Sequence, residues 1–162
     1  MKIVSIQPVH YPQIAAIYLQ GIATGHATFQ TSAPTWSDWD SSHLKHSRVA
    51  AFIGNDLAGW AALSPVSSRC VYEGVAEVSV YIADNYRGKG IGKALLQQLI
   101  ADSEANNTWT LQSGIFPENT GSIRLHESCG FRQIGFREKI GKMNGVWRDN
   151  IIMERRSKIV GL

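Results

Sequence analysis

The sequence has few of the features that mark disulfide-rich, membrane-embedded or secreted proteins. Its 162 residues include two cysteines, Cys70 and Cys129, which lie far apart and lack Cys-x-x-Cys spacing. We therefore expect two free thiols, buried or half-buried, in a reducing compartment. No apolar run approaches the ~20 residues of a membrane-spanning helix, and no signal peptide is recognised after Met1. These absences predict a cytoplasmic protein that does not contact a membrane.

A strong charge of either sign is also missing. Sixteen Lys and Arg residues face 13 Asp and Glu, a net charge of +3, and the basic residues form no single tract. Nucleic acid is therefore not an expected partner, whereas the mild positive excess suits a small anionic ligand. The histidines at positions 10, 26, 43 and 46 have no ligand spacing with cysteines or carboxylates, so we expect no metal.

Hydrophobic residues make up 44% of the chain and charged residues 18%, which predicts one ordered domain over residues 1–162. Apolar residues alternate in some segments and recur at helical spacing in others. The order of these segments favours an α/β fold on a mixed sheet. Strands are expected at residues 2–6, 48–53, 57–63, 75–83, 109–115, 131–140 and 146–154, and helices around 14–22, 34–46, 91–100 and 119–129.

The segment 75–83 has the clearest strand pattern in the sequence. Glu77, Ser79 and Tyr81 alternate with Ala76, Val78, Val80 and Ile82, so the two sets point to opposite faces of a sheet. A glycine-rich segment, Arg87-Gly88-Lys89-Gly90-Ile91-Gly92-Lys93, follows before the next helix. Glycines let backbone N–H groups approach an anion, and a helix start adds unpaired N–H groups and a positive dipole end. The segment is therefore a candidate pyrophosphate cradle.

Two better-known phosphate loops do not fit this turn. A Walker A loop needs four residues between its glycines and a hydroxyl after its Lys, but three residues separate Gly88 from Gly92, and Ala94 follows Lys93. A dinucleotide fingerprint needs its third glycine three positions after the second, whereas Gly92 comes two after Gly90. The remaining pattern is Arg-x-x-Gly-x-Gly. An ordinary glycine-rich turn is the alternative interpretation.

A second motif follows downstream. Asn119-Thr120-Gly121-Ser122-Ile123-Arg124-Leu125-His126, ending Cys129-Gly130-Phe131, is similar to the Asn-x-x-Ser-x-x-Leu-Tyr…Gly-Phe segment of the GCN5-related N-acetyltransferases. In that superfamily it follows an Arg-x-x-Gly-x-Gly turn, as it does here. Further segments resemble the phosphinothricin and methionine sulfoximine/sulfone acetyltransferase branch: residues 21–25, 27–29, 67–72, 77–81, 114–119 and 141–149. The resemblance covers nearly the whole chain and implies a splayed mixed sheet flanked by helices, with acetyl-CoA inserted between two parallel strands.

The resemblance also implies roles for individual residues. Glu77 is the candidate base that removes a proton from the acceptor amine, with a partly desolvated carboxylate near the strand's exit. His126 stands where many superfamily members carry a Tyr that protonates the departing thiolate, and imidazole can act as acid or base near neutral pH. A solvated surface Glu and a surface His are the alternatives. The expected cofactor-binding residues are Val80, Tyr81 and Ile82, through their backbone, together with Arg87, Gly88, Lys89, Gly90, Ile91, Gly92, Lys93 and Asn119, although Asn119 could equally cap a helix.

The substrate implied by this branch is a small amino-acid-like molecule. Arg69 is the candidate ligand for its acid group because the planar guanidinium suits bidentate pairing, and a surface ion pair is the alternative. The other expected substrate-binding residues are Phe29, Tyr72, Glu77 and Ser79. An acetyltransferase of protein or peptide amines and a non-catalytic CoA-binding sensor are the competing functions. A homodimer is implied by resemblance alone.

Overall fold

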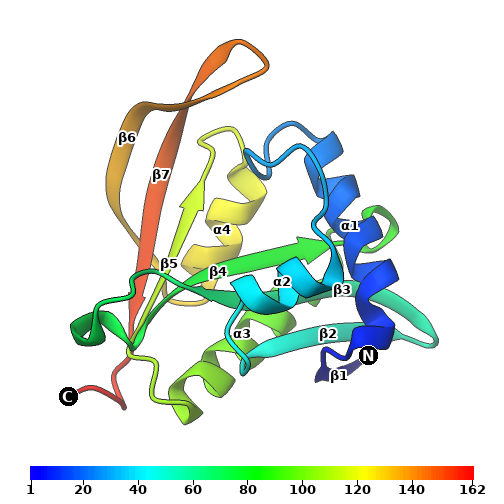
Figure 1. Ribbon diagram of the computed structural model, residues 1–162, viewed down its shortest axis with the longest axis horizontal. Helices are drawn as coiled ribbons and strands as arrows, with labels where there is room; N and C mark the ends of the chain where they lie inside the picture. The colour runs from blue at the N-terminus through cyan, green and yellow to red at the C-terminus, as the bar shows by residue number, and fades with distance from the viewer.

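A computed structural model describes residues 1–162, and all seven of its strands belong to one open sheet in the order β1-β2-β3-β4-β5-β7-β6 (Figure 1). The strands are β1 (Lys2–Ser5), β2 (Arg48–Ile53), β3 (Asp56–Pro65), β4 (Val75–Ile82), β5 (Thr110–Ile115), β6 (Arg132–Met143) and β7 (Val146–Arg156). Only β4 and β5 pair in parallel, and every other neighbouring pair is antiparallel. The expected mixed α/β sheet is therefore confirmed.

Helices cover both faces of this sheet. They are α1 (Tyr11–Ala23), α2 (Trp36–Ser42), α3 (Ile91–Ala105) and α4 (Thr120–Ser128), with short 3-10 turns η1 (Pro8–His10), η2 (Cys70–Tyr72) and η3 (Asp84–Tyr86). One apolar core joins α3 to β2, β3, β4, β5 and β7, and a second joins α1 and α2 to the opposite face of β2 and β3. The alternation expected along β4 is confirmed, because Ala76 and Val78 belong to the α3 core whereas Tyr81 packs on the α1 core.

The hairpin of β6 and β7 extends beyond the rest of the sheet (Figure 1). It turns at Asn144 and Gly145, both with positive φ (50° and 80°), as a two-residue hairpin turn requires. Its register shifts between Arg137 and Gly141, so β6 carries a bulge near Lys139 (φ 47°). The turn was predicted from Asn-Gly, but nothing in the sequence signalled the bulge.

Two expectations need correction. The second helix is shorter than the predicted 34–46: Thr35 caps it by accepting a hydrogen bond from the Asp38 N–H at 3.2 Å, and His43 is already extended. Cys70 is exposed rather than buried or half-buried, because η2 lies in the long connection between β3 and β4, outside both cores. Both thiols are free, as expected. No helix is long and apolar enough to cross a membrane.

Candidate active site

The sheet opens into a wedge where its two parallel strands separate. β4 and β5 pair over three positions, ending at Glu77 opposite Gln112, and then diverge. The Ala83 N–H donates to the Ala58 carbonyl of β3 at 2.9 Å, so the backbone N–H groups of odd-numbered residues along β4 point toward β3. Because N–H groups alternate along a strand, those of Val80 and Ile82 face the open side. Unpaired backbone donors therefore line the wedge, which no local sequence pattern could have specified.

The wedge is part of a large cavity of about 1280 Å³ that runs from the glycine-rich turn to the α1–α2 connection. Most of the residues predicted for the site line it: Phe29, Glu77, Ser79, Val80, Tyr81, Ile82, Arg87, Gly88, Gly90, Ile91, Gly92, Lys93, Asn119 and His126. Three predicted residues, Arg69, Tyr72 and Lys89, are not among the lining residues. The fold therefore brings together residues that lie up to 97 positions apart in the sequence, Phe29 and His126.

The glycine-rich turn is shaped for a ligand that approaches its backbone closely. Gly88 and Gly90 have φ of +74° and +78°, and a Cβ at either would meet nothing within 4 Å. Positive φ explains the need for glycine, and the open space leaves room for an anion. Gly90 is the N-cap of α3, so the first N–H groups of that helix point to the same place. At Gly92 a Cβ would lie 3.2 Å from Leu125, which indicates close packing of α3 on α4.

The basic residues of the turn are held by the protein in different ways. The Arg87 Nε–H donates to the Ile82 carbonyl at 3.4 Å, and its Nη2 pairs with Asp84 at 2.8 Å. Arg87 therefore connects the turn to the end of β4, and it also lines the cavity. The Lys89 ammonium lies over the Tyr86 ring, 5.2 Å from its centroid, whereas Lys93 lines the cavity.

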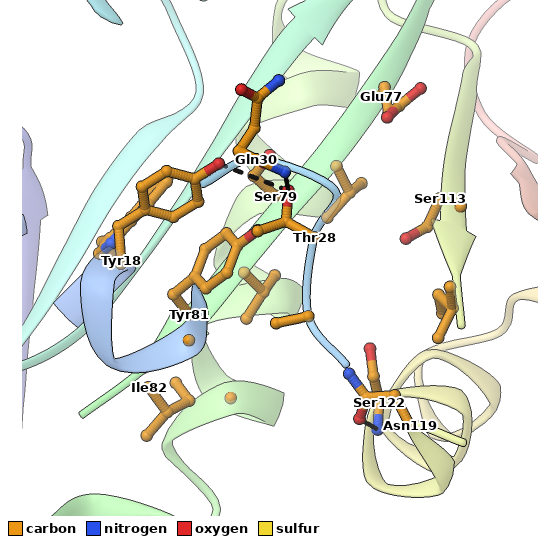
Figure 2. A pocket seen from close by; sticks show the side chains of 18 of the residues that line it. Tyr18, Thr28, Gln30, Glu77, Ser79, Tyr81, Ile82, Ser113, Asn119 and Ser122 are labelled. Atoms are coloured by element: carbon orange, nitrogen blue, oxygen red, sulfur yellow. Dashed lines mark hydrogen bonds between the residues drawn. The ribbon is translucent and has the colours of Figure 1, made fainter. Parts of the chain in front are cut away.

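Glu77 lies at the point where β4 and β5 separate. Its side chain is exposed and accepts a hydrogen bond from the Gln112 Nε2 at 3.3 Å. The expected desolvation of this carboxylate is therefore not present, because the last paired position of the wedge opens to solvent. Ser79 and Tyr81 follow on the same face of β4, and Ser113 faces the cavity from β5 (Figure 2).

A group of hydroxyls in the cavity was missed by sequence reasoning. Tyr18 of α1 lies 3.5 Å from Thr28, oxygen to oxygen, and their hydroxyls face each other in Figure 2. Burial, and next the neighbouring Tyr18, raises the pKa of Tyr81 far above its usual value, while a hydrogen bond with Thr28 opposes this more weakly, so the Tyr81 hydroxyl stays protonated. Gly21 in the last turn of α1 was the available signal: a Cβ there would lie 2.8 Å from the Tyr81 ring. Tyr18, Thr28 and Tyr81 therefore form a cluster of hydroxyls in the cavity wall, between α1 and β4.

His126 is buried against Phe131 and only 3% exposed, so the surface interpretation is wrong. Its Nδ1 lies 2.7 Å from the Ser122 carbonyl, an atom that can only accept, so Nδ1 carries the proton. Nε2 is then the unprotonated nitrogen, and it is buried without a hydrogen-bond partner. Burial lowers the pKa of the imidazole, and the Ser122 contact opposes this more weakly. Near pH 7 the ring is neutral and offers a lone pair.

Asn119 uses both ends of its side chain within the protein. Its Oδ1 accepts from the Ser122 N–H at 3.2 Å, which makes it the N-cap of α4. Its Nδ2 donates to the His26 carbonyl at 3.2 Å, which ties the α1–α2 connection to α4. Of the two roles expected for Asn119, the structure supports capping and shows a contact that the sequence did not indicate.

Arg69 and Tyr72 lie together on the surface near η2. Both are exposed, and the guanidinium of Arg69 lies 5.4 Å from the centroid of the Tyr72 ring. Phe29, by contrast, is 37% exposed in the α1–α2 connection, and its ring contacts Phe116 edge-on with centroids 4.7 Å apart. Within one chain, the structure therefore joins Phe29, Glu77 and Ser79 in one cavity but leaves Arg69 and Tyr72 outside it.

Comparisons with known proteins agree with this geometry. Residues 16–131 match the Acetyltransferase (GNAT) family, and the chain therefore belongs to that family of acetyltransferases. It is 33% identical to phosphinothricin N-acetyltransferase of Alcaligenes faecalis, covering 89% of this chain and 76% of the relative. It is 29% identical to an L-methionine sulfoximine/L-methionine sulfone acetyltransferase of Pseudomonas aeruginosa, covering 88% and 87%.

Solved structures share the same fold. A phosphinothricin acetyltransferase from Sinorhizobium meliloti in complex with AcCoA superposes with a TM-score of 0.88 and 25% identity, covering 99% of this chain and 90% of that one. A ribosomal-protein-alanine N-acetyltransferase from Brucella melitensis superposes with a TM-score of 0.89 and 26% identity, covering 97% and 100%.

Proposed function

We propose that the protein uses acetyl-CoA to acetylate the α-amino group of a small amino-acid-like molecule of the phosphinothricin, methionine sulfone or methionine sulfoximine type. The observation that carries this proposal is the arrangement along β4. Along this strand lie the Glu77 carboxylate and then the backbone N–H groups of Val80 and Ile82, which face the open side. The strand is followed by the glycine-rich turn, and all these groups line one cavity. The named activities of the relatives support the substrate class.

The residues of the turn fit the pyrophosphate of acetyl-CoA. A Cβ at Gly88 or Gly90 would point into open space, so a ligand can lie against this backbone. In the proposal the N–H groups of residues 88–92 bind the pyrophosphate, with Arg87 and Lys93 beside it and Lys89 at the periphery. When bound, acetyl-CoA supplies the acetyl group as a thioester. The open-side N–H groups of Val80 and Ile82, with the backbone around Tyr81, then face the thioester carbonyl and stabilise negative charge on its oxygen.

Glu77 acts as the base in this proposal. An ammonium ion has no lone pair, so the acceptor must lose a proton before it attacks the thioester. Glu77 is a solvent-exposed carboxylate on the cavity wall and can take that proton directly or through one water molecule. His126 contributes an acceptor, because the neutral ring has its free lone pair on Nε2. In this tautomer it binds a donor group in the cavity and cannot itself protonate a thiolate.

Arg69 and Tyr72 remain the proposed ligands for the acid group of the substrate, with Phe29, Glu77 and Ser79. Because Arg69 and Tyr72 lie outside the cavity of their own chain, their role depends on a second chain, and we propose a homodimer. We further propose a single acetyltransferase domain over residues 1–162 in the cytoplasm. It acts without a metal and without binding nucleic acid or membranes.

The test is release of free CoA thiol from acetyl-CoA with a panel of amines. The panel contains phosphinothricin, methionine sulfone, methionine sulfoximine, ordinary amino acids, polyamines and peptides that begin with alanine. We expect saturable turnover confined to the phosphorus and tetrahedral-sulfur amino acids. Turnover on the alanine peptides alone would favour the second candidate, N-terminal protein acetylation, which the ribosomal-protein-alanine acetyltransferase fold supports. Tight acetyl-CoA binding with no turnover on any amine would indicate a CoA-binding sensor instead.

A further inference from the structure

Arg148, on β7, makes an unusual set of contacts for a residue so far along the chain from the rest of the site. Its side chain is 11% exposed. One guanidinium nitrogen, Nη1, donates to the Gly25 carbonyl at 2.9 Å. The other, Nη2, lies 2.9 Å from His26 Nδ1 and 3.3 Å from the Glu118 carboxylate. Arg148 therefore joins β7 to the connection between α1 and α2 and to the segment before α4.

Aromatic packing continues from the same guanidinium into the cavity. Arg148 lies over the Phe116 ring, 4.2 Å from its centroid, and Phe116 in turn contacts Phe29. The Phe29 ring also lies against Gly141 of β6, where a Cβ would come within 2.8 Å. The position of Phe29 is thus set by Phe116 and Gly141, both distant from it in the sequence, and Arg148 supports Phe116.

The segment that Arg148 holds is one wall of the active-site cavity. Thr24, His26, Ala27, Thr28, Phe29 and Gln30 all line it. The segment passes beside α4 (Figure 1), where Asn119 provides another polar contact by donating to the His26 carbonyl. A planar guanidinium can contact Gly25, His26 and Glu118 while stacking on Phe116, whereas an ammonium offers no such flat, forked surface.

We propose that Arg148 is a positioning residue that holds residues 24–30 closed over the acceptor end of the cavity and so restricts the enzyme to small amines. The inference rests on the proposed function, whose substrate range it explains. Arg148 and Gly141 lie beyond residues 16–131, so these contacts are outside the part of the chain that the family model matches. It accounts for the segment Gly141 to Asp149, which resembles the branch but has no part in the catalytic chemistry.

The experiment compares Arg148→Gln and Arg148→Lys with Arg132→Gln. Arg132 is a matched control, because it is an exposed arginine of the same hairpin that pairs with Glu154 away from the cavity. We expect Arg148→Gln to raise the KM for the amine about tenfold or more, with little change in the KM for acetyl-CoA. Amide hydrogen exchange at residues 24–30 should become faster in that variant, whether or not an active substrate is known. Arg148→Lys should be intermediate if folded, and Arg132→Gln should match the wild type in both measurements.

Gly141→Ala tests the same wall without touching the guanidinium. The added Cβ displaces the Phe29 ring, so the KM for the amine should rise while exchange at residues 24–27 stays slow. If Arg148→Gln keeps the wild-type rate of amide exchange at residues 24–30 and the wild-type KM for the amine, the inference is overturned. A wild-type enzyme that acetylates no amine would contradict the proposed function instead, and the exchange measurement would still decide the role of Arg148.

Discussion

At the scale of single residues, burial distinguishes the two side chains of the cavity that are proposed to take part in catalysis. Glu77 and His126 both line it, but the carboxylate is exposed while the imidazole is 3% exposed and hydrogen-bonded through Nδ1. The exposed carboxylate is in direct contact with water. A buried imidazole remains neutral because burial penalises its charged form. Sequence motifs identified both residues. Only their surroundings in the fold show that Glu77 contacts solvent, whereas His126 is neutral and has its free lone pair in the interior.

The buried histidine makes a prediction about stability. Burial lowers the pKa of His126 below its usual 6.5, and it lowers that of His43 in the same way. As pH falls through about 6.5, the unfolded chain therefore binds protons that the folded chain does not. The free energy of unfolding should be greatest above that pH and decrease below it. One such group contributes at most about 1.4 kcal/mol per pH unit.

Urea unfolding between about pH 8 and about pH 5 measures this slope. His126→Gln removes one contributing group, so its slope should be smaller than that of the wild type but not zero, since His43 remains. His10→Gln is a suitable control, because His10 is only partly buried in η1, where its Nδ1 accepts from the Gln7 N–H and its ring lies edge-on to Phe52. An unchanged slope in His126→Gln would contradict a neutral, buried imidazole.

At the scale of elements, the glycine turn before α3 depends on backbone conformation. Gly88 and Gly90 adopt positive φ, which costs an L-residue about 1–2 kcal/mol. The sequence pattern predicted this turn correctly because glycine adopts such φ values with little of the steric cost that other residues incur. The Asn144-Gly145 turn was predicted for the same reason. The bulge near Lys139 was not, since it depends on pairing with β7 and on the Asp149 carboxylate, which accepts from the Lys139 N–H at 2.7 Å.

The glycine turn also yields a prediction with an internal control. Gly90→Ala and Gly54→Ala both place a Cβ at positive φ (78° and 59°) with nothing within 4 Å. Each should destabilise the fold by about 1–2 kcal/mol, measured by denaturant unfolding. Gly90→Ala should also weaken CoA binding in titration calorimetry, because its Cβ occupies the proposed pyrophosphate site. Gly54 lies in the β2–β3 turn, so its variant should bind CoA normally. Equal binding by both variants would contradict the proposed cradle.

At the scale of the whole molecule, the proposed active site depends on how the strands and their connections are arranged. The cavity exists because β4 and β5 separate after Glu77, and the α1–α2 connection then covers the opening beside α4. Arg69 and Tyr72 lie outside this cavity, and large apolar side chains remain exposed on the β6–β7 hairpin: Ile134, Phe136, Ile140, Val146 and Trp147. Both observations support the proposed homodimer.

Complementation between two inactive variants tests shared sites. Glu77→Gln should lower kcat/KM by about 10²–10⁴-fold through loss of the base, and Arg69→Ala should raise the KM for the amine. If Arg69 serves the cavity of the partner, co-expressed Glu77→Gln and Arg69→Ala chains should regain up to about a quarter of wild-type activity. Half of such dimers are mixed, and each mixed dimer has one intact site. Activity no greater than that of the separate variants, in chains shown to be dimeric by light scattering, would contradict sharing.

The sequence by itself determined the features that depend on local conformation and periodicity. These are the strand alternation that places Glu77 and Ser79 on one face, the positive-φ glycines of the proposed cradle, the Asn-Gly hairpin turn and the order of elements that defines an α/β sheet. The tertiary structure alone decided the burial of His126, the hydroxyl cluster of Tyr18, Thr28 and Tyr81, and the hydrogen bond from Arg148 to Gly25. Each of these joins side chains through desolvation or contact across the fold. Such interactions follow from how the elements pack, which no window of neighbouring residues contains.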